Sequence, residues 1–238
     1  GIKKILNTKV STTGRISTTN YFSLYSEGKW GVIDSNGEIL IEPQYNEMII
    51  IPNQTKPYFI CTYNVNYETN EYNTKVVNEK NQTVINGYDN VNFIDSYDES
   101  GNLKYIDDVL KVEKDGKYGL ISLTGSEILD CKYEDIFILE GIDNSLIIKE
   151  NGLYGLCDYK GNIVVETEYT SIKGIGNNYK NGYITVNEDN LYGIIDFNSD
   201  KIFDNKYLDI KPIYSSNKYA VNINNKYKII VKTEKILM

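Results

Sequence analysis

The feature that most constrains the fold is a short phrase that recurs along almost the whole chain of 238 residues. With an aromatic residue or its substitute as the marker, the copies fall at positions 30, 74, 118, 154, 192 and 227, spaced 35 to 44 residues apart. They read GKWGVIDSNGEI at 28–39, TKVVNEKN at 74–81, DGKYGLISLTG at 115–125, NGLYGLCDYKG at 151–161, NLYGIID at 190–196 and KYKIIV at 226–231. A period of this length is typical of proteins built from repeated supersecondary units.

Turn residues divide each copy into short strands. A pair such as Glu27-Gly28, Asp115-Gly116 or Asn151-Gly152 before the aromatic residue is typical of a two-residue hairpin turn. The Asp-x-x-Gly spacing after it, from Asp34 to Gly37 and from Asp158 to Gly161, predicts a type I turn that the Asp caps. An apolar segment that begins at a Tyr adds a further strand, so each unit is predicted to hold four short antiparallel strands.

The aromatic residue and the glycine beside it predict a close approach within each unit. A glycine in a strand often marks a place where other atoms come near the backbone, and we expect the aromatic ring to lie over it. The tyrosines that follow the phrase are expected to pack in the core or between units. They are Tyr45, Tyr88, Tyr133, Tyr169 and Tyr207.

The phrase resembles that of the WG-repeat family, which is named for its Trp-Gly pair. Only Trp30-Gly31 keeps this pair, whereas Tyr118-Gly119, Tyr154-Gly155 and Tyr192-Gly193 replace the Trp by Tyr. Thr74 and Tyr227-Lys228 depart further from it. The resemblance implies a β-repeat scaffold that serves as an adaptable interaction surface, and it carries no catalytic residue over to this chain.

These observations predict an all-β protein with a single domain of six four-stranded units. A small six-bladed β-propeller is expected, in which the N-terminal run from Ile2 to Val10 pairs with the last unit and closes the ring. An open β-solenoid of hairpin repeats and a five-bladed ring are the alternatives. The predicted units lie near residues 1–44, 45–87, 88–132, 133–168, 169–206 and 207–238.

The composition excludes several kinds of chemistry. The chain has no histidine, its single arginine is Arg15, and its formal charge is −8, so the usual general base, the commonest metal ligand and clustered phosphate contacts are missing. We therefore predict no cofactor, no metal, no nucleic-acid partner and no enzymatic activity. No apolar run is long enough to span a membrane. Cys61, Cys131 and Cys157 are interpreted as small buried hydrophobic residues.

The acids at the repeated turns first suggest a metal series. Asp34, Asp158 and Asp196 recur at one position of the unit, and Asp34-Ser35-Asn36-Gly37 contains a fragment of a calcium-loop pattern. A calcium loop needs several more oxygen ligands and a closing Glu, which this segment lacks. We therefore predict that these acids cap turns.

Two insertions interrupt the repeat and supply the candidate binding residues. The first, YNVNYETNEY at 63–72, combines Tyr63, Tyr67 and Tyr72 with amide side chains, a composition suited to sugar or protein surfaces. The second, DSYDESG at 95–101, runs on to residues 107–108 and concentrates acids, among them Asp98 and Glu99, which could bind a cation or a basic partner. The alternative interpretation of both insertions is a long solvated hairpin turn.

The sequence favours a non-catalytic scaffold that binds a protein partner through loops of a β-repeat domain. A carbohydrate-binding module that uses the aromatic and Asn residues is the alternative, and a glycoside hydrolase with two facing carboxylates about 5–10 Å apart is the third. Exposed rings repeated at equivalent positions would favour a lectin, whereas an irregular aromatic patch on the insertions would favour a protein partner. Because the chain begins at Gly1, we expect an extracytoplasmic or cell-surface protein whose signal segment has been removed.

Overall fold

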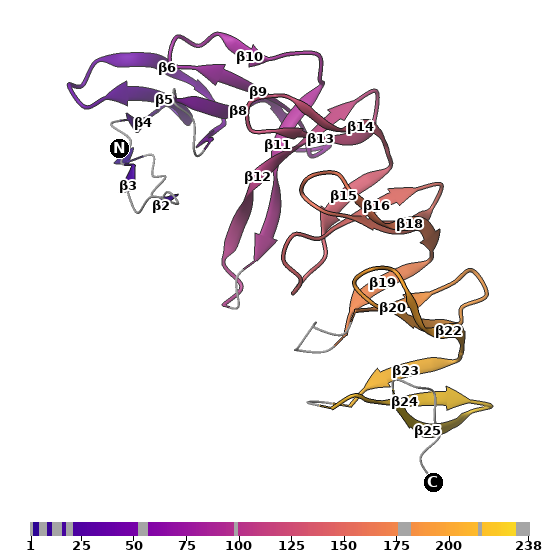
Figure 1. Ribbon diagram of the computed structural model, residues 1–238. Helices are drawn as coiled ribbons and strands as arrows, with labels where there is room; N and C mark the ends of the chain where they lie inside the picture. Colours follow the sequence, from indigo (N-terminus) through magenta and orange to yellow (C-terminus); the bar gives the residue numbers. More distant parts are fainter. Residues whose placement is uncertain are drawn as a thin grey trace. The chain divides into compact units, whose positions relative to one another are not determined.

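The computed structural model describes residues 2–4, 9–10, 16–17, 21–51, 57–97, 100–175, 182–213 and 216–231. Strands are the regular secondary structure throughout these ranges, and they form six successive sheets and one short hairpin (Figure 1). Five of the six sheets have four strands each, and the sixth has three among the described residues. The prediction of an all-β protein with four-stranded units is confirmed for these five sheets.

Each sheet joins its strands in the order of the sequence, and the pairs of known register are antiparallel. The first strands are β1 (Ile2–Lys4), β7 (Glu47–Ile50), β11 (Asn90–Tyr97), β15 (Asp135–Ile138), β19 (Ser171–Gly174) and β23 (Asp209–Pro212). The second strands are β4 (Tyr21–Ser26), β8 (Tyr58–Asn66), β12 (Leu103–Lys114), β16 (Leu146–Glu150), β20 (Tyr183–Val186) and β24 (Lys218–Ile223).

The third strand of every sheet carries the repeated phrase. The third strands are β5 (Lys29–Asp34), β9 (Glu71–Asn78), β13 (Lys117–Ser122), β17 (Leu153–Cys157), β21 (Tyr192–Ile195) and β25 (Lys226–Val231). The fourth strands are β6 (Ile39–Tyr45), β10 (Thr83–Ile85), β14 (Glu127–Tyr133), β18 (Ile163–Tyr169) and β22 (Lys201–Tyr207). A separate hairpin of β2 (Lys9–Val10) and β3 (Ile16–Ser17) lies in the sequence between β1 and β4.

The N-terminal strand belongs to the first sheet. Residues Ile2 and Lys4 of β1 lie opposite Leu24 and Phe22 of β4. The prediction that this segment pairs with the last unit and closes a ring is therefore wrong. The physical reason is that the first unit, like the others, needs a first strand to pair with the outer edge of its second strand, and β1 fills this place. The choice between a propeller and a solenoid stays a prediction.

The predicted two-residue hairpin turns are confirmed. Glu27 and Gly28 have φ values of 51° and 79°, and Asn151 and Gly152 have values of 52° and 80°. Two successive positive φ angles are the signature of a type I′ turn, whose twist matches that of the flanking strands. Glycine or asparagine is favoured at such positions because their backbones reach the left-handed region at low cost.

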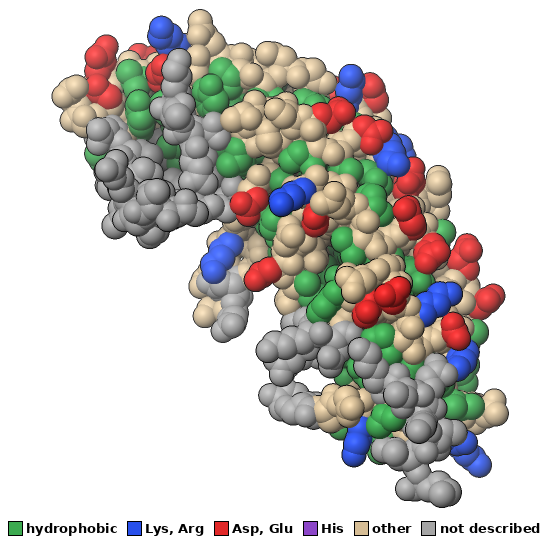
Figure 2. All heavy atoms as spheres, viewed as in Figure 1, with side chains coloured by type: hydrophobic (Ala, Val, Ile, Leu, Met, Phe, Trp, Pro, Cys, Tyr) green, Lys and Arg blue, Asp and Glu red, His purple; other side chains and the backbone are tan. Residues whose placement is uncertain are grey.

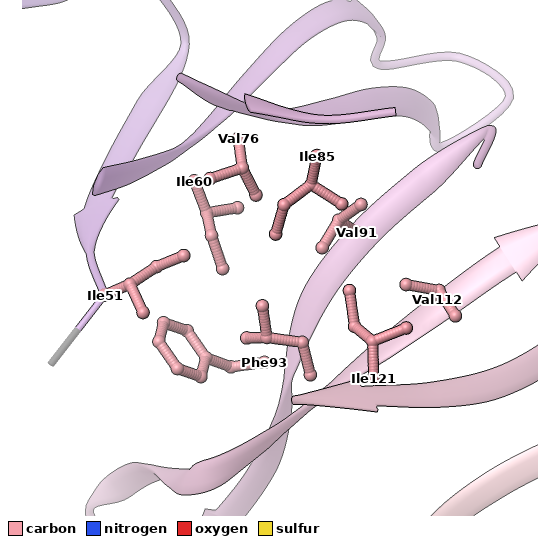
Figure 3. Packing of buried hydrophobic residues seen from close by; sticks show 9 residues of the cluster. Ile51, Ile60, Val76, Ile85, Val91, Phe93, Val112 and Ile121 are labelled. Carbon is pink, nitrogen blue, oxygen red and sulfur yellow. The ribbon is translucent and has the colours of Figure 1, made fainter. Parts of the chain in front are cut away.

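The chain forms two compact units, of which the first contains residues 1–94 and 105–131. Neighbouring residues of a third strand point into different cores, because side chains alternate between the two faces of a strand. Val77 packs with Val32 and Phe59 of the first two sheets, whereas Val76 packs with Ile121 of the third. Figure 3 shows this second core, where Val76 and Ile60 face residues of β11, β12 and β13.

The second compact unit contains residues 95–104 and 132–238. It repeats the same arrangement, with Ile195 in one core beside Leu156 and Ile194 in the next beside Ile230. All four of these side chains are almost fully buried, with exposed fractions of at most 1%. The fourth and fifth sheets therefore contribute one residue of the phrase to the core that each shares with the next sheet.

Candidate functional site

The glycine of the phrase lies under a bulge of the fourth strand. A Cβ atom added to Gly155 would lie 2.5 Å from the carbonyl oxygen of Val165, and one added to Gly119 would lie 2.5 Å from that of Leu129. At Gly31 the equivalent neighbours are the backbone atoms of Ile41 and the two residues after it. The predicted close approach is confirmed, but the backbone of the fourth strand makes it. The fourth strand, and not the aromatic ring that we expected, therefore explains why this residue is a glycine.

The aromatic residue of the phrase instead faces the tyrosine that ends the fourth strand. Trp30 of β5 pairs with Tyr45 of β6, whereas Val32 pairs with Ile41. The register therefore shifts between these two pairs, and β6 bulges there. Tyr154 and Tyr192 pair in the same way with tyrosines at the ends of β18 and β22. Tyrosines at these ends are buried, as the sequence predicted for the packing role of Tyr45, Tyr133, Tyr169 and Tyr207.

The motif rings are partly covered by side chains of their own sheet. The centroids of Tyr25 and Trp30 are 4.6 Å apart, and Lys111 Nζ lies 4.2 Å from the centroid of Tyr118. Phe137 meets Tyr154 edge-on at 6.4 Å. The rings at repeated positions are therefore engaged in local packing, although Tyr25 remains 44% exposed.

The repeated turn acids bind the backbone of their own turns. Asp34 Oδ1 accepts hydrogen bonds from the N–H groups of Asn36 and Glu38, both at 2.8 Å, and Asp158 and Asp196 do the same in their turns. The bond from Glu38 is the main cause that holds the pKa of Asp34 below its usual value. The predicted capping role is confirmed. In the described part of the chain, no cluster of three or more Cys, Asp or Glu side chains is placed to hold a metal ion.

The first insertion is the tip of the hairpin formed by β8 and β9. Tyr67 is 84% exposed and Tyr72 is 47% exposed, so both present their rings to solvent. Tyr63 differs from them, because it packs against the core between the first two sheets. Lys75 Nζ lies between two rings, 5.1 Å from the centroid of Tyr63 and 5.2 Å from that of Tyr45. Of the three tyrosines predicted to bind a partner, Tyr67 and Tyr72 are therefore exposed and Tyr63 is a packing residue.

One amide side chain contacts the hydroxyl group of Tyr67, and two others meet across the same hairpin. Asn46 Nδ2 donates to the Tyr67 hydroxyl at 3.4 Å, and Asn46 Oδ1 accepts from Lys29 Nζ at 2.9 Å. Asn64 Nδ2 donates to Asn73 Oδ1 at 3.3 Å across the hairpin. Sequence reasoning missed Asn46 and Lys29, since Lys29 lies on β5 and Asn46 lies between β6 and β7, both distant in the sequence from the insertion.

The second insertion extends the hairpin of β11 and β12. Asp98 and Glu99, which the sequence proposed as binding residues, lie outside the described residues. On the strands beside them, Tyr97 is 63% exposed and Leu103 is 49% exposed. Tyr105 is 36% exposed and stacks on Phe93, with ring centroids 5.4 Å apart. The alternation of Leu103 and Tyr105 along β12 was the signal in the sequence for these exposed apolar side chains.

The cysteines are buried or partly buried, and charged side chains of both signs are mixed on the surface that Figure 2 shows. Cys61 and Cys157 are fully buried, and burial raises the pKa of each thiol to about 12. Their interpretation as buried hydrophobic residues is confirmed, whereas Cys131 is only partly buried. On the face shown in Figure 2, basic side chains lie among acidic ones. No helix in the described ranges is long and apolar enough to cross a membrane.

A family model described as "WG containing repeat" matches residues 30–50, 118–153 and 154–192. Three segments of this chain therefore match the WG-repeat model. The matched segments begin at Trp30, Tyr118 and Tyr154, which confirms the resemblance at the strongest copies of the phrase. The copies at 74–81 and 226–231, in which a lysine takes the place of the glycine, lie outside the matched segments. No curated protein matches the chain.

Solved structures similar to this chain include the crystal structure of a eukaryotic initiation factor, with a TM-score of 0.41 and 12% identity over 92% of this chain and 62% of that one. The chain therefore spans less than two thirds of that relative. Apo AztD from Citrobacter koseri matches with a TM-score of 0.37 and 12% identity, over 92% and 69% of the two chains. The WD40 β-propeller domain of Doa1 matches with a TM-score of 0.30 and 10% identity, over 82% of this chain and 71% of that one.

Proposed function

We propose that the protein is a non-catalytic scaffold that binds a protein partner through the tips of its insertion hairpins. The observation that carries this proposal is the position of the exposed aromatic residues. Tyr67 and Tyr72 stand on the first insertion, and Tyr97 and Tyr105 stand on the second. Aromatic residues are enriched at the centres of protein interfaces, because they bury a large area at a small entropic cost.

The regular parts of the repeats support this choice. Trp30, Tyr118 and Tyr154 pack on side chains of their own sheets, so their rings have less free surface for a ligand. A lectin that binds at each unit would need equivalent free rings. Irregular aromatic surfaces on insertions are better suited to one partner of defined shape.

The non-catalytic part of the proposal is supported by the roles of the carboxylates. The acids that recur in the units accept hydrogen bonds from backbone N–H groups of their own turns; they are Asp34, Asp158 and Asp196. A glycoside hydrolase needs one carboxyl group that protonates the leaving group and another that attacks or activates water. Acids that cap turns are not free for either task.

The proposal is tested by comparing partner capture by three proteins. The wild-type chain, the double variant Tyr67→Ser/Tyr72→Ser and the control Ile163→Ser are each cross-linked to interacting proteins, which are identified by mass spectrometry. Ile163 is 39% exposed on a regular fourth strand, which makes it a matched apolar control. The purified captured protein is expected to bind the wild type and the control equally and to lose at least tenfold in affinity for the double variant. Equal affinity for all three would exclude the first hairpin.

A carbohydrate ligand is the second candidate, and one specific observation favours it. An exposed ring with amides beside it, as Tyr67 has with Asn46, can stack on a sugar while the amides bind hydroxyl groups. A glycan array probed with the same three proteins separates the two candidates. Glycan binding that the double variant loses, together with no protein capture, would replace the proposal by this one.

A further inference from the structure

The link between the second and third sheets combines an exposed asparagine with an exposed glycine. Asn86 and Gly87 follow β10 and precede β11, and neither residue belongs to a strand. A Cβ atom added to Gly87 would meet no atom of the described residues within 4 Å. The space around this pair is therefore open, and water reaches both residues.

An asparagine followed by a glycine can modify itself without an enzyme. The backbone nitrogen of the glycine gives up its proton and attacks the side-chain amide carbon of the asparagine. A new C–N bond forms, the bond to the amide NH2 group breaks, and ammonia leaves with the proton. Water then opens the cyclic imide, either at the side-chain carbonyl to give aspartate or at the backbone carbonyl to give isoaspartate. Glycine favours the attack because it has no Cβ atom to obstruct it.

Three Asn-Gly pairs lie within the described ranges, and all three are exposed, whereas Asn181, which begins a fourth pair, lies outside them. Ring closure requires rotation about the Cα–C bond of the asparagine until its amide carbon reaches the next nitrogen. At Asn36 this rotation is opposed, because Nδ2 donates to Asp34 Oδ2 at 3.1 Å and the N–H donates to Asp34 Oδ1 at 2.8 Å. The N–H of Gly37, whose nitrogen would attack, donates to the carbonyl oxygen of Asp34 at 3.2 Å. This pair is therefore held in an unreactive turn.

The pair at Asn151 and Gly152 is restrained in a different way. It forms the two-residue turn between β16 and β17, in which both residues have positive φ angles. The Gly152 N–H donates to Glu134 Oε2 at 3.2 Å. The attacking nitrogen must become negatively charged, and a carboxylate beside it opposes this charge. The turn and the carboxylate therefore both protect Asn151.

Asn86 has neither kind of restraint. Among the residues that the structure describes, no hydrogen bond involves the Asn86 side chain or the N–H group of Gly87. The restraints begin on either side of the pair. Ile85 is 7% exposed in the core that Figure 3 shows, and the Asp89 N–H donates to the carbonyl oxygen of Glu113 at 2.8 Å. The pair is thus the unrestrained part of a link whose two ends are fixed.

We propose that Asn86 is a site of spontaneous modification, at which the chain forms an imide with Gly87 and opens it with water to aspartate and isoaspartate. Both products carry one more negative charge than asparagine. Isoaspartate also lengthens the backbone of the link by one atom, because the chain then continues through the side-chain carbon. Since Ile85 and Asp89 are fixed, the longer link must loosen one of these ends. The site is separate from the insertion hairpins and does not depend on the proposed scaffold role.

The experiment follows the three described pairs by peptide mass spectrometry while the full chain is incubated at mildly alkaline pH. Conversion changes the mass because OH replaces NH2, and an isoaspartate-specific methyltransferase labels the isoaspartate. Asn86 is expected to convert at least tenfold faster than Asn36 and Asn151. In urea that unfolds the chain, the three rates should converge, because the dipeptides are identical. Equal rates in the folded chain, or the same tenfold difference in urea, would overturn the proposal.

Two variants test the assignment and the protection separately, with circular dichroism as the check on folding. Asn86→Gln should remove the methyltransferase label from this peptide, because closure of the larger ring from glutamine is much slower. Asp34→Ala removes the two side-chain hydrogen bonds that hold Asn36. The rate at Asn36 should then rise at least threefold, while the rate at Asn86 stays unchanged. An unchanged rate at Asn36 would contradict protection by the turn acid.

Hydrogen exchange tests what the modification does to the link. Exchange at the Asp89 N–H and along β10 is compared among the fresh chain, the isoaspartate form purified after incubation, and the variant Asn86→Asp. This variant adds the charge without the extra backbone atom, so it should exchange like the fresh chain. The isoaspartate form should exchange at least tenfold faster at one of the two ends. Equal exchange in all three would overturn the predicted loosening of the link.

Discussion

The second and fourth repeats show what one residue decides within the unit. In the fourth, Gly155 lets the seven-residue strand β18 bulge across β17 and pair Tyr169 with Tyr154. In the second, Lys75 occupies the glycine position, and β10 stops after three residues. Lys75 turns its ammonium group toward the rings of Tyr45 and Tyr63. The glycine is thus a requirement of the bulged fourth strand and not of the repeat as such.

The largest expected effect comes from closing the space above the glycine. Gly155→Ala places a Cβ atom 2.5 Å from the carbonyl oxygen of Val165, so the strand must shift, and the free energy of unfolding should fall by about 3 kcal/mol. Urea denaturation followed by circular dichroism measures it. Lys75→Ala is the matched change in the second repeat and should cost much less. Similar losses at the two positions would contradict the comparison.

A smaller effect is expected from the lysine that replaces the glycine. Lys75→Met keeps an unbranched side chain but removes the charge between two aromatic rings, and we expect a loss of about 1 kcal/mol. Tyr63→Leu should remove part of the same energy, so the double variant should cost less than the sum of the single variants. Strict additivity in this double-mutant cycle would show that Lys75 does not interact with Tyr63.

The turn acids should make the free energy of unfolding decrease at low pH. Partial desolvation raises the pKa of Asp158, but the hydrogen bonds from Asn162 and Lys160 together hold this pKa below its usual value. A lowered folded pKa stabilises the protein above the unfolded value, and this contribution is lost as the pH falls through the folded pKa. Asp158→Ala should cost about 1 kcal/mol near neutral pH. The difference from wild type should shrink below pH 4, and a constant difference would contradict the mechanism.

The smallest expected effect sharpens the contrast between the regular repeats and the first insertion. Tyr67→Ser changes an 84% exposed side chain outside the cores, so the free energy of unfolding should change by less than about 0.5 kcal/mol. Thermal unfolding by calorimetry measures it, with Tyr63→Ser as the comparison on the same hairpin. Tyr63 packs against a core, and its variant should unfold at a clearly lower temperature. Equal effects would mean that Tyr67 is a packing residue.

Much of the unit could be predicted from the sequence because its signals are local. The turn at Asn151 and Gly152 needs two positive φ angles, and the capping by Asp34 needs only the next four residues. The partner of β1 could not be predicted, because any extended apolar segment can pair with any open edge. The different roles of Tyr63 and Tyr67 were also hidden, since they depend on Lys75 of β9 and on Asn46, which lies between β6 and β7.

The sequence by itself determined the repeated phrase, the four-stranded form of its regular units, the turns between strands and the absence of histidine chemistry. Only the tertiary structure decided why the glycine is needed, which tyrosines remain exposed and which sheet takes the N-terminal strand. The physical reason is the range of the interactions. Turns depend on the backbone preferences of consecutive residues, whereas burial and strand pairing depend on segments that meet only after folding.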